Sequence, residues 1–290
     1  MSNPSICVVI PYFGHWPFWI DCFLESCRAN NDINWLIYTD CGPVRNCPAN
    51  VKIVDCNFDV YCDRVTRVLG IDFRPDAAYK LCDIKPALGL LHVDELTGYD
   101  FWAFGDIDLL YGDLRATFTS ELLARYDLLS THARRISGHF CLLRNTDEMR
   151  TAFMRVKDWK GQMESQHHQA FDESAFSKLF LRHKNSPAWV RQLAAIFDPW
   201  LKRGRFLEAY TTPNGKILWV DDSRQYPTEW YWQNGVVSNN MASNLRFPYF
   251  HFMVWKKYWN TQPVKLSVSG NSRLVFTDRG IQVDNDACVL

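Results

Sequence analysis

The stretch Tyr99–Asp113, YDFWAFGDIDLLYGD, decides the fold of this chain. Its apolar run, Phe101–Phe104, ends abruptly in Gly105, Asp106, Ile107 and Asp108. A short apolar run bounded by turn-forming residues is typical of a buried strand in an α/β sheet. Ligands of such folds bind beyond the carboxyl ends of the strands, which is where these two acids are expected.

The spacing of Asp106 and Asp108 predicts that both carboxylates share one face, because side chains alternate along a strand. Two neighbouring carboxylates repel each other unless one is protonated or a cation lies between them. A hard divalent ion, Mg²⁺ or Mn²⁺, keeps both ionised and commonly completes its shell with water and phosphate oxygens. The pair therefore predicts a metal site that holds a diphosphate. The alternative is that the acids cap the next helix or lie in solvent.

The composition limits the classes of function. Of the 290 residues, 47% are hydrophobic and 22% charged, as is usual for a globular protein. The 32 basic and 32 acidic residues balance, which argues against nucleic acid as a partner. We see no apolar run of the roughly eighteen residues that a membrane span needs and no signal peptide at the N-terminus. The ten cysteines form no Cys-x-x-Cys pair, so we expect reduced thiols in a cytoplasmic protein.

The N-terminal half alternates between strand and helix patterns. Apolar runs predict strands at 6–10, 35–39 and 51–54, and helical spacing predicts a helix over 16–28. This alternation indicates βαβ units and a largely parallel sheet flanked by helices. A single glycine follows the first strand in place of Gly-x-Gly-x-x-Gly, and there is no Walker loop. We therefore do not expect an NAD or ATP cradle.

Other polar residues fall where helices or strands are expected to begin. Asp83 and Lys85 precede a helical pattern. Asp83 could cap that helix or bind a ribose or a base edge, and Lys85 could be a solvated charge or neutralise a phosphate. Asp172 and Glu173 precede an amphipathic helix, where the helix dipole favours carboxylates and where one can act as a general base. His251 lies inside an apolar stretch. It could be a buried core residue or a ligand of a divalent metal.

The second half of the chain is less regular. We expect a helix over 146–159, a loop with the adjacent histidines 167 and 168, a strand over 217–220 and a loop over 234–244. This histidine pair could bind a metal, but adjacent side chains point in different directions, so we do not expect a metal site there. The C-terminal end reads as short strands with turns at 270–271 and 278–280. These patterns predict one domain, residues 1–260, with a β-hairpin extension over 261–290.

The order of these parts resembles that of the GT-A glycosyltransferases. These are single α/β, Rossmann-like domains that bind a nucleotide-diphosphate sugar through an Asp-x-Asp motif and a divalent metal. Two blocks, YKLCDIKPALG (79–89) and GYDFWAFGDIDLLYGDL (98–114), are similar to those of a bacterial family found with O-antigen and capsule synthesis. SGHFCLLRN, FDESAFS and FHFMVWKK extend the resemblance more loosely.

The resemblance implies roles for individual residues. Asp108 would ligate the metal, Asp106 would share it or contact the ribose, and His251 would complete the metal shell. Asp172 or Glu173 would be the base of an inverting enzyme. The nucleobase, the ribose, the diphosphate and the donor sugar would be contacted by residues near strand ends and the helix start: Pro11, Tyr12, Asp40, Asp83, Lys85, Asp106, Gly138 and His139.

The expected function is that of a metal-dependent glycosyltransferase. With Mn²⁺ or Mg²⁺, it would move a hexose such as galactose from a UDP-sugar to a hydroxyl of a growing, lipid-linked bacterial surface glycan. Inversion is favoured by the acid pair at 172–173, and the acceptor places the enzyme at the inner face of the cytoplasmic membrane. The alternatives are a metal-dependent nucleotidyl- or phosphotransferase and a non-catalytic protein that binds carbohydrate through its aromatic C-terminal region.

Overall fold

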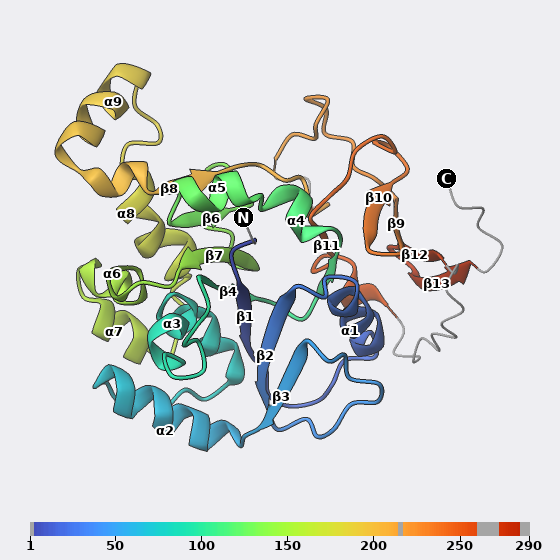
Figure 1. Cartoon of the computed structure of the whole chain (residues 1–290), viewed down its shortest axis with the longest axis horizontal. Coiled ribbons are helices and arrows are strands. Elements are labelled where there is room, and N and C mark those ends of the chain that lie inside the picture. Colours follow the sequence, from blue (N-terminus) through green and yellow to red (C-terminus); the bar gives the residue numbers. More distant parts are fainter. Residues whose placement is uncertain (1–2, 214–216, 260–272, 285–290) are drawn as a thin grey trace.

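A seven-stranded mixed sheet forms the centre of the computed structural model, which describes residues 3–213, 217–259 and 273–284 (Figure 1). Its strand order is β3-β2-β1-β4-β7-β6-β8. β1 to β4 run parallel, β7 is antiparallel to both of its neighbours, and β8 is parallel to β6. The strands are β1 Ile6–Pro11, β2 Ile33–Thr39, β3 Val51–Asp55, β4 Phe101–Gly105, β6 Leu128–Ser130, β7 Phe140–Arg144 and β8 Gly204–Phe206.

The central strands are apolar throughout because both faces of the sheet are covered. Along β1, Val8 and its even-numbered neighbours pack with Phe23 of α1, whereas Val9 packs with Tyr61 and Val65 of α2 on the opposite face. Such two-sided burial produces continuous apolar runs, which is why these strands were readable from the sequence. The predicted fold class, a mostly parallel sheet flanked by helices, is confirmed.

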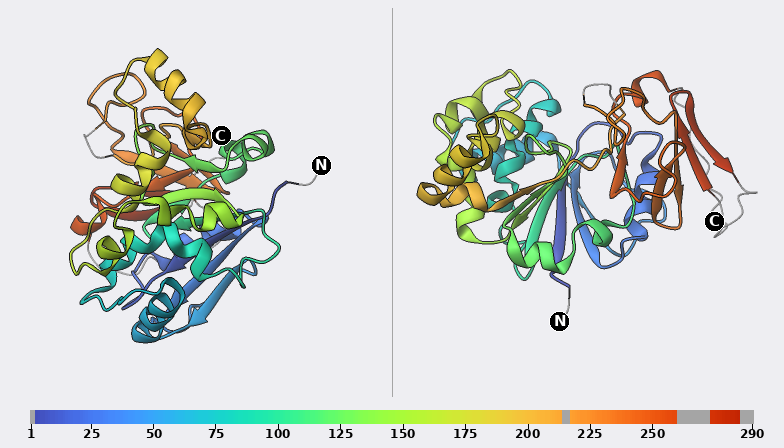
Figure 2. Two further views of the ribbon diagram at one scale, coloured as in Figure 1. Left: turned by 90° about the vertical axis from the view of Figure 1, so that its left-hand side faces the viewer. Right: turned by 90° about the horizontal axis from the view of Figure 1, so that it is seen from above.

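Helices and short helical turns cover the two faces (Figures 1 and 2). α1, α4 and α5 lie on one face, and most of the others lie on the opposite face. The elements are α1 Ile20–Arg28, α2 Phe58–Leu69, η1 Ala78–Ala87, α3 Leu88–Leu91, α4 Leu114–Thr117, α5 Ser120–Arg125, α6 Asp147–Arg150, η2 Ala152–Arg155, α7 Trp159–Glu164, η3 Asp172–Phe176, α8 Ser177–Leu181, α9 Ala188–Phe197, η4 Pro199–Lys202 and η5 Lys256–Tyr258.

A second, four-stranded antiparallel sheet lies beside the first (Figure 2, right). Its order is β10-β9-β12-β13, and an aromatic core that includes Trp230 and Phe276 packs against it. The predicted C-terminal hairpin is confirmed as β12 and β13, and β12 also pairs with β9. The predicted turn at 270–271 and the division at 260/261 lie outside the described residues. The strands are β9 Glu229–Gln233, β10 Val236–Asn239, β12 Arg273–Thr277 and β13 Gly280–Asp284.

Three local predictions were wrong. The helix expected over 146–159 breaks at Val156, whose backbone is extended, and restarts after Asp158, whose φ is 56°. Residues 217–220 form no strand, because Trp219 bonds through its backbone to Ser223 within a turn. The loop expected over 234–244 contains β10, which follows a two-residue turn at Asn234–Gly235, both at positive φ. An Asn-Gly pair between apolar strands is the common signature of this hairpin turn, so the sequence did carry the signal.

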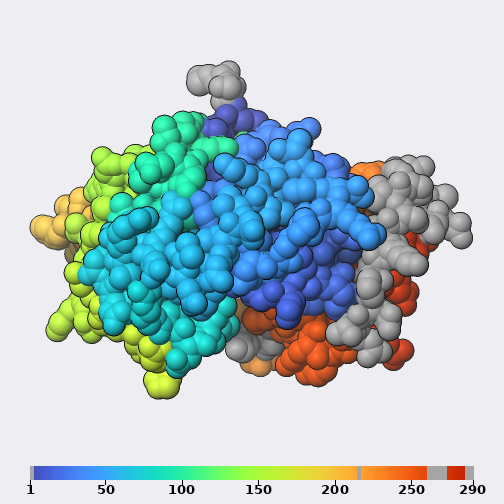
Figure 3. All heavy atoms as spheres, turned by 90° about the horizontal axis from the view of Figure 1, so that it is seen from below, coloured from blue at the N-terminus to red at the C-terminus, as the bar shows by residue number. Residues whose placement is uncertain are grey.

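The N-terminal half of the chain makes up most of the face in Figure 3, and the C-terminal strands lie at its right-hand edge. Within the described part of the chain, no helix combines the length and the apolar character that crossing a membrane would require.

Candidate functional site

A cavity of about 830 Å³ opens at the carboxyl ends of β1 and β4. Its wall is built from segments far apart in sequence, because parallel strands deliver their following loops to the same edge of the sheet. Ten of the residues predicted from the sequence line it: Pro11, Tyr12, Lys85, Asp106, Asp108, Gly138, His139, Asp172, Glu173 and His251. Neither Asp40 nor Asp83 is among the described residues of the wall.

A small antiparallel ladder brings His251 to Asp108. β5, Leu109–Tyr111, follows the acidic pair directly and pairs with β11, Tyr249–His251, in a register that sets His251 opposite Leu109. The ladder continues where the Phe252 backbone N–H donates to the Asp108 carbonyl at 3.2 Å. Two segments separated by about half of the chain thus meet at one point, which the residue pattern alone did not show.

Asp106, Asp108 and His251 form a cluster with the donor atoms of a metal site. One ligand atom from each lies within 4.8 Å of the others. His251 Nε2 is 3.5 Å from Asp108 Oδ2, and its Nδ1 is 2.9 Å from the Thr212 hydroxyl. A hydrogen bond to the second ring nitrogen fixes a histidine's orientation, as is usual for metal ligands. Two carboxylates and one imidazole fit a divalent cation such as Mn²⁺.

Two lysines balance the two acids of this cluster. Lys256 Nζ is 2.8 Å from Asp108 Oδ2. Burial tends to raise the pKa of Asp108, but the charges of His251 and Lys256 outweigh it and hold that pKa well below its usual range. Lys85 donates to Asp106 and, at 2.7 Å, to the Gly138 carbonyl. Each of the two carboxylates therefore faces an ammonium group, and both ammonium groups lie in the cavity wall.

His139 lies directly behind the cluster. Its ring stacks on that of His251, with centroids 4.0 Å apart and planes 23° from parallel. One of its ring nitrogens is 3.0 Å from the Ser137 hydroxyl. Burial, and then the nearby His251, hold the pKa of His139 well below its ordinary value. We therefore expect a neutral imidazole that supports His251 by packing against it.

A second pair of acids lies on the same cavity at η3. Asp172 is buried and accepts a hydrogen bond from the Glu173 backbone N–H at 2.8 Å, whereas the Glu173 carboxylate pairs with Arg135 at 3.0 Å. Burial raises the pKa of Asp172 to about 7, with Lys85 opposing and the Glu173 charge adding to the shift. A carboxylate with a pKa near neutrality is suited to take up a proton at physiological pH.

Gly138 lets the two acids approach the strand end closely. A methyl group added at its Cα would lie 2.9 Å from Asp172 Oδ2 and 2.9 Å from Glu173 Oε1, which is closer than real contacts allow. Small residues at strand ends commonly mark such close approaches. The resemblance implied that Gly138 is one of the residues that contact the nucleotide sugar. In the structure Gly138 lies against the acid pair, and its carbonyl accepts a hydrogen bond from Lys85.

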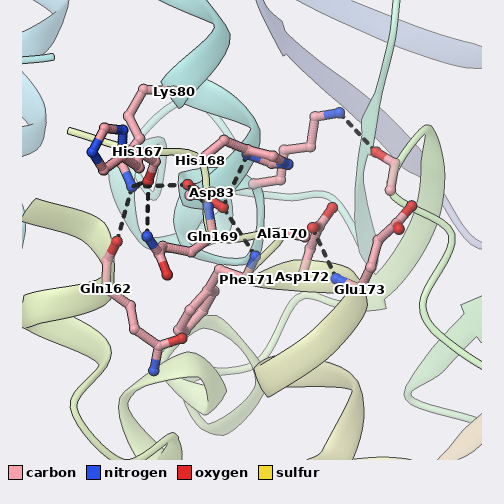
Figure 4. A network of polar contacts seen from close by, with 12 residues as sticks. Lys80, Asp83, Gln162, His167, His168, Gln169, Ala170, Phe171, Asp172 and Glu173 are labelled. Atoms are coloured by element: carbon pink, nitrogen blue, oxygen red, sulfur yellow. Dashed lines mark hydrogen bonds and ion pairs between the residues drawn. The ribbon is translucent and has the colours of Figure 1, made fainter. Parts of the chain in front are cut away.

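Asp83 and Asp40 hold the walls of the site in place. Asp83 is fully buried, pairs with Lys80 at 2.8 Å, and accepts from the backbone N–H groups of Gln169 and Phe171, each at 2.9 Å (Figure 4). The segment that leads into Asp172 is therefore anchored by this carboxylate. Asp40 accepts from the Gly14 backbone N–H at 2.7 Å and so fixes the loop after β1.

Replacing Lys80 with methionine is expected to cost about 3–5 kcal/mol of unfolding free energy, because it leaves the buried Asp83 carboxylate without its countercharge. Denaturant unfolding followed by circular dichroism measures this loss. Arg74→Met is the matched control, since Arg74 pairs with Asp63 at 2.7 Å on the surface and should cost less than about 1 kcal/mol. Equal losses in the two variants would contradict the anchoring role.

Some residues of the wall that contact the predicted ones were not predicted from the sequence. Lys256, Arg135 and Thr212 each contact a predicted site residue. Lys256 lies in the FHFMVWKK stretch but had no role assigned to it, and the other two lie in no recognisable motif. Lys256 follows His251 by five residues, so its place beside the histidine was the only available signal. The other two belong to loops whose positions depend on the tertiary fold.

Several solved structures are similar to this one. The galactosyltransferase LgtC is 14% identical, with a TM-score of 0.36 over 58% of this chain and 71% of that chain. Mouse xyloside xylosyltransferase 1 is 8% identical, with a TM-score of 0.38 over 72% of this chain and 87% of that chain. A glycosyltransferase involved in glycosylation of the major capsid of PBCV-1 is 8% identical, with a TM-score of 0.39 over 72% and 84%.

No curated protein sequence matches this chain. A family model does match it, over residues 8–279, and it is described as a family of unknown function, DUF6625. This match spans nearly the whole sequence, and the chain therefore belongs to the DUF6625 family.

Proposed function

We propose that this protein is a metal-dependent glycosyltransferase that uses a nucleotide-diphosphate sugar. The observation that carries the proposal is the pairing of two sites in one cavity. At one side, Asp106, Asp108 and His251 offer metal ligands, and at the other Asp172 offers a carboxylate with a pKa near 7. Transfer of a sugar needs both a place for the departing diphosphate and an acceptor for the proton of the incoming hydroxyl.

The donor would lie along the ends of β1 and β4. Asp106, Asp108 and His251 would hold the divalent ion, Mn²⁺ or Mg²⁺, which would supply Lewis-acid stabilisation to the diphosphate. Lys85 and Lys256 would bind phosphate oxygens directly. The nucleoside would lie at the loop after β1, where Pro11 and Tyr12 line the cavity and Tyr12 stacks on Trp16 with centroids 5.8 Å apart.

The proton of the acceptor hydroxyl would pass to Asp172. As the bond between the anomeric carbon and the diphosphate breaks, the acceptor oxygen would bond to that carbon from the opposite side, which inverts its configuration. The hydroxyl would release its proton to this carboxylate. Glu173 would position Arg135 through their ion pair. The proposed donor is a UDP-hexose such as UDP-galactose, and the proposed acceptor is a lipid-linked glycan of a bacterial surface polymer at the cytoplasmic side of the membrane.

The aromatic C-terminal region does not support the alternative of a carbohydrate-binding surface. Trp219, Trp230, Trp232, Phe250 and Trp255 are all buried in the core beside the second sheet. Their faces are covered by one another, so they are not available to stack on a sugar.

Calorimetry with UDP is expected to show binding that Mn²⁺ strengthens by about tenfold or more, since the ion would bridge the acids and the diphosphate. Titrations with and without Mn²⁺, and with EDTA added, measure this dependence. Incubation with labelled UDP-sugars then separates the reaction classes by their products. Glycosyl transfer releases a nucleoside diphosphate, whereas transfer of the nucleotidyl group releases the sugar 1-phosphate and transfer of the phosphosugar releases a nucleoside monophosphate. Equal UDP binding with and without metal would contradict the proposal.

A further inference from the structure

Helix α9 lies outside the compact part of the molecule. It projects away from the sheet, at the upper left of Figure 1 and at the top of the left view of Figure 2. The structure describes all of α9, Ala188–Phe197, and none of its residues is buried. Val190 and Ala194 are half-buried on the side that contacts η4. The helix thus rests on its neighbour along one side only.

The outward side of α9 is apolar. Trp189, Leu193, Ile196 and Phe197 have 65%, 50%, 65% and 85% of their surface exposed. Their spacing of three and four residues places them on one stripe of the helix, with Arg191 on the opposite side. Single exposed apolar residues are ordinary on protein surfaces, but a contiguous stripe marks a site of interaction.

The segment around α9 is strongly basic, although the whole chain has no net charge. Residues 177–206 include one acid, Asp198, against seven basic residues. Arg203 of this segment pairs with Asp127 and Glu148, whereas Lys178, Lys202 and Arg205 are exposed. An apolar stripe on a segment with such exposed cations complements an anionic surface that also accepts apolar side chains. The seven basic residues are Lys178, Arg182, Lys184, Arg191, Lys202, Arg203 and Arg205.

The chain connects α9 to the cavity at both of its ends. Residues 177–206 leave the cavity wall just after Glu173 and return to it at Glu208, another wall residue. Lys184 Nζ also donates to the Arg134 carbonyl at 2.7 Å, next to Arg135 of the wall. The segment that carries α9 is therefore joined at both of its ends to residues of the cavity wall.

We propose that α9 docks this protein onto an anionic lipid surface. The four apolar side chains enter the boundary between headgroups and acyl chains, with Trp189 at the interface, and the exposed Lys178, Lys202 and Arg205 of the same segment contact the lipid phosphates. A protein partner would have to offer a groove shaped to a convex, projecting helix, whereas a lipid interface accepts such a helix without a preformed pocket. The proposal goes beyond sugar transfer and holds whatever reaction the cavity performs.

Sedimentation of the full chain with vesicles tests the docking. We expect binding to phosphatidylcholine vesicles that contain phosphatidylglycerol, and weak binding to vesicles of phosphatidylcholine alone. Added salt should weaken the binding because the charge attraction is screened. The double substitution Ile196→Glu and Phe197→Glu should weaken it by about a hundredfold, since two apolar side chains of this size each contribute roughly tenfold.

Val60→Glu is the matched control. Val60 is 60% exposed on α2, on the side of the molecule away from α9 (Figures 1 and 2), so this substitution should leave vesicle binding unchanged. Sedimentation equilibrium of the wild type separates lipid docking from self-association through α9. A wild type that fails to bind anionic vesicles, a double variant that still binds them, or a dimer that the double substitution dissociates would overturn the proposal.

Discussion

Asp108→Asn is expected to lower the rate of sugar transfer by about a thousandfold or more while the protein remains folded. The substitution keeps the size of the side chain but removes the buried charge that faces His251 and Lys256. The cation site then loses one of its three ligand groups, and the departing diphosphate loses the charge stabilisation that the cation would supply. Initial rates with a labelled UDP-sugar and calorimetry with UDP and Mn²⁺ measure the two losses.

Asp94→Asn is the matched control for this prediction, because Asp94 is an exposed acid outside the cavity. It should leave both the rate and the UDP affinity unchanged. Far-ultraviolet circular dichroism of the two variants checks that each is folded. Full activity of Asp108→Asn, or wild-type activity that EDTA does not affect, would show that Asp108 holds no catalytic metal.

Asp172→Asn is expected to reduce turnover by about 10²–10⁴, the usual contribution of a general base. Because the base must be unprotonated and the pKa of Asp172 is about 7, the wild-type rate should rise with pH up to roughly neutrality and then level off. The variant should lose this limb of the profile. Glu173→Gln should have a smaller effect, since that carboxylate already pairs with Arg135. If neither substitution costs more than about tenfold, well below the usual range, the acid pair is not the base.

Asp172 should also affect the thermal stability of the protein, which can be measured independently of activity. The pKa of the Asp172 carboxyl rises from 3.8 to about 7 on folding, mainly through burial, with Lys85 lowering it and the charges of Glu173 and Asp106 raising it. Between these two values the folded state holds a proton that the unfolded state has released, so stability falls as pH rises. Asparagine is neutral throughout. Asp172→Asn should therefore raise the melting temperature relative to wild type above pH 7 more than below pH 4.

The local signals in the sequence were reliable where burial is two-sided or a turn is sharp. β1, β2 and β4 were predicted because covered parallel strands need apolar residues on both faces. The continuous helix predicted over 146–159 was wrong, because the chain breaks at Val156, which packs with Met163 in the core. At Asn234–Gly235 the signal was present in the residues, and the hairpin was missed although the turn type demands that pair.

In the candidate site, too, some features could be predicted from local sequence and others depend on contacts between distant segments. Asp106 and Asp108 could be located from one strand and its end, since the alternation of side chains along a strand is a local property. That Lys256 reaches Asp108, that Asp83 anchors the segment before Asp172, and that Gly138 lies against the acid pair are contacts across long separations in sequence. No short motif encodes them.

By itself, the sequence determined the sheet, the acidic pair at its edge and the hairpin at the C-terminal end, because each depends on the pattern of residues within one short segment. Only the tertiary structure decided which charges face one another, that the acid at 172 is buried enough to titrate near neutrality, and that the apolar stripe of α9 stays uncovered. Charge pairing and burial depend on distance through space and on exclusion of water, and both are fixed only when distant segments of the chain meet.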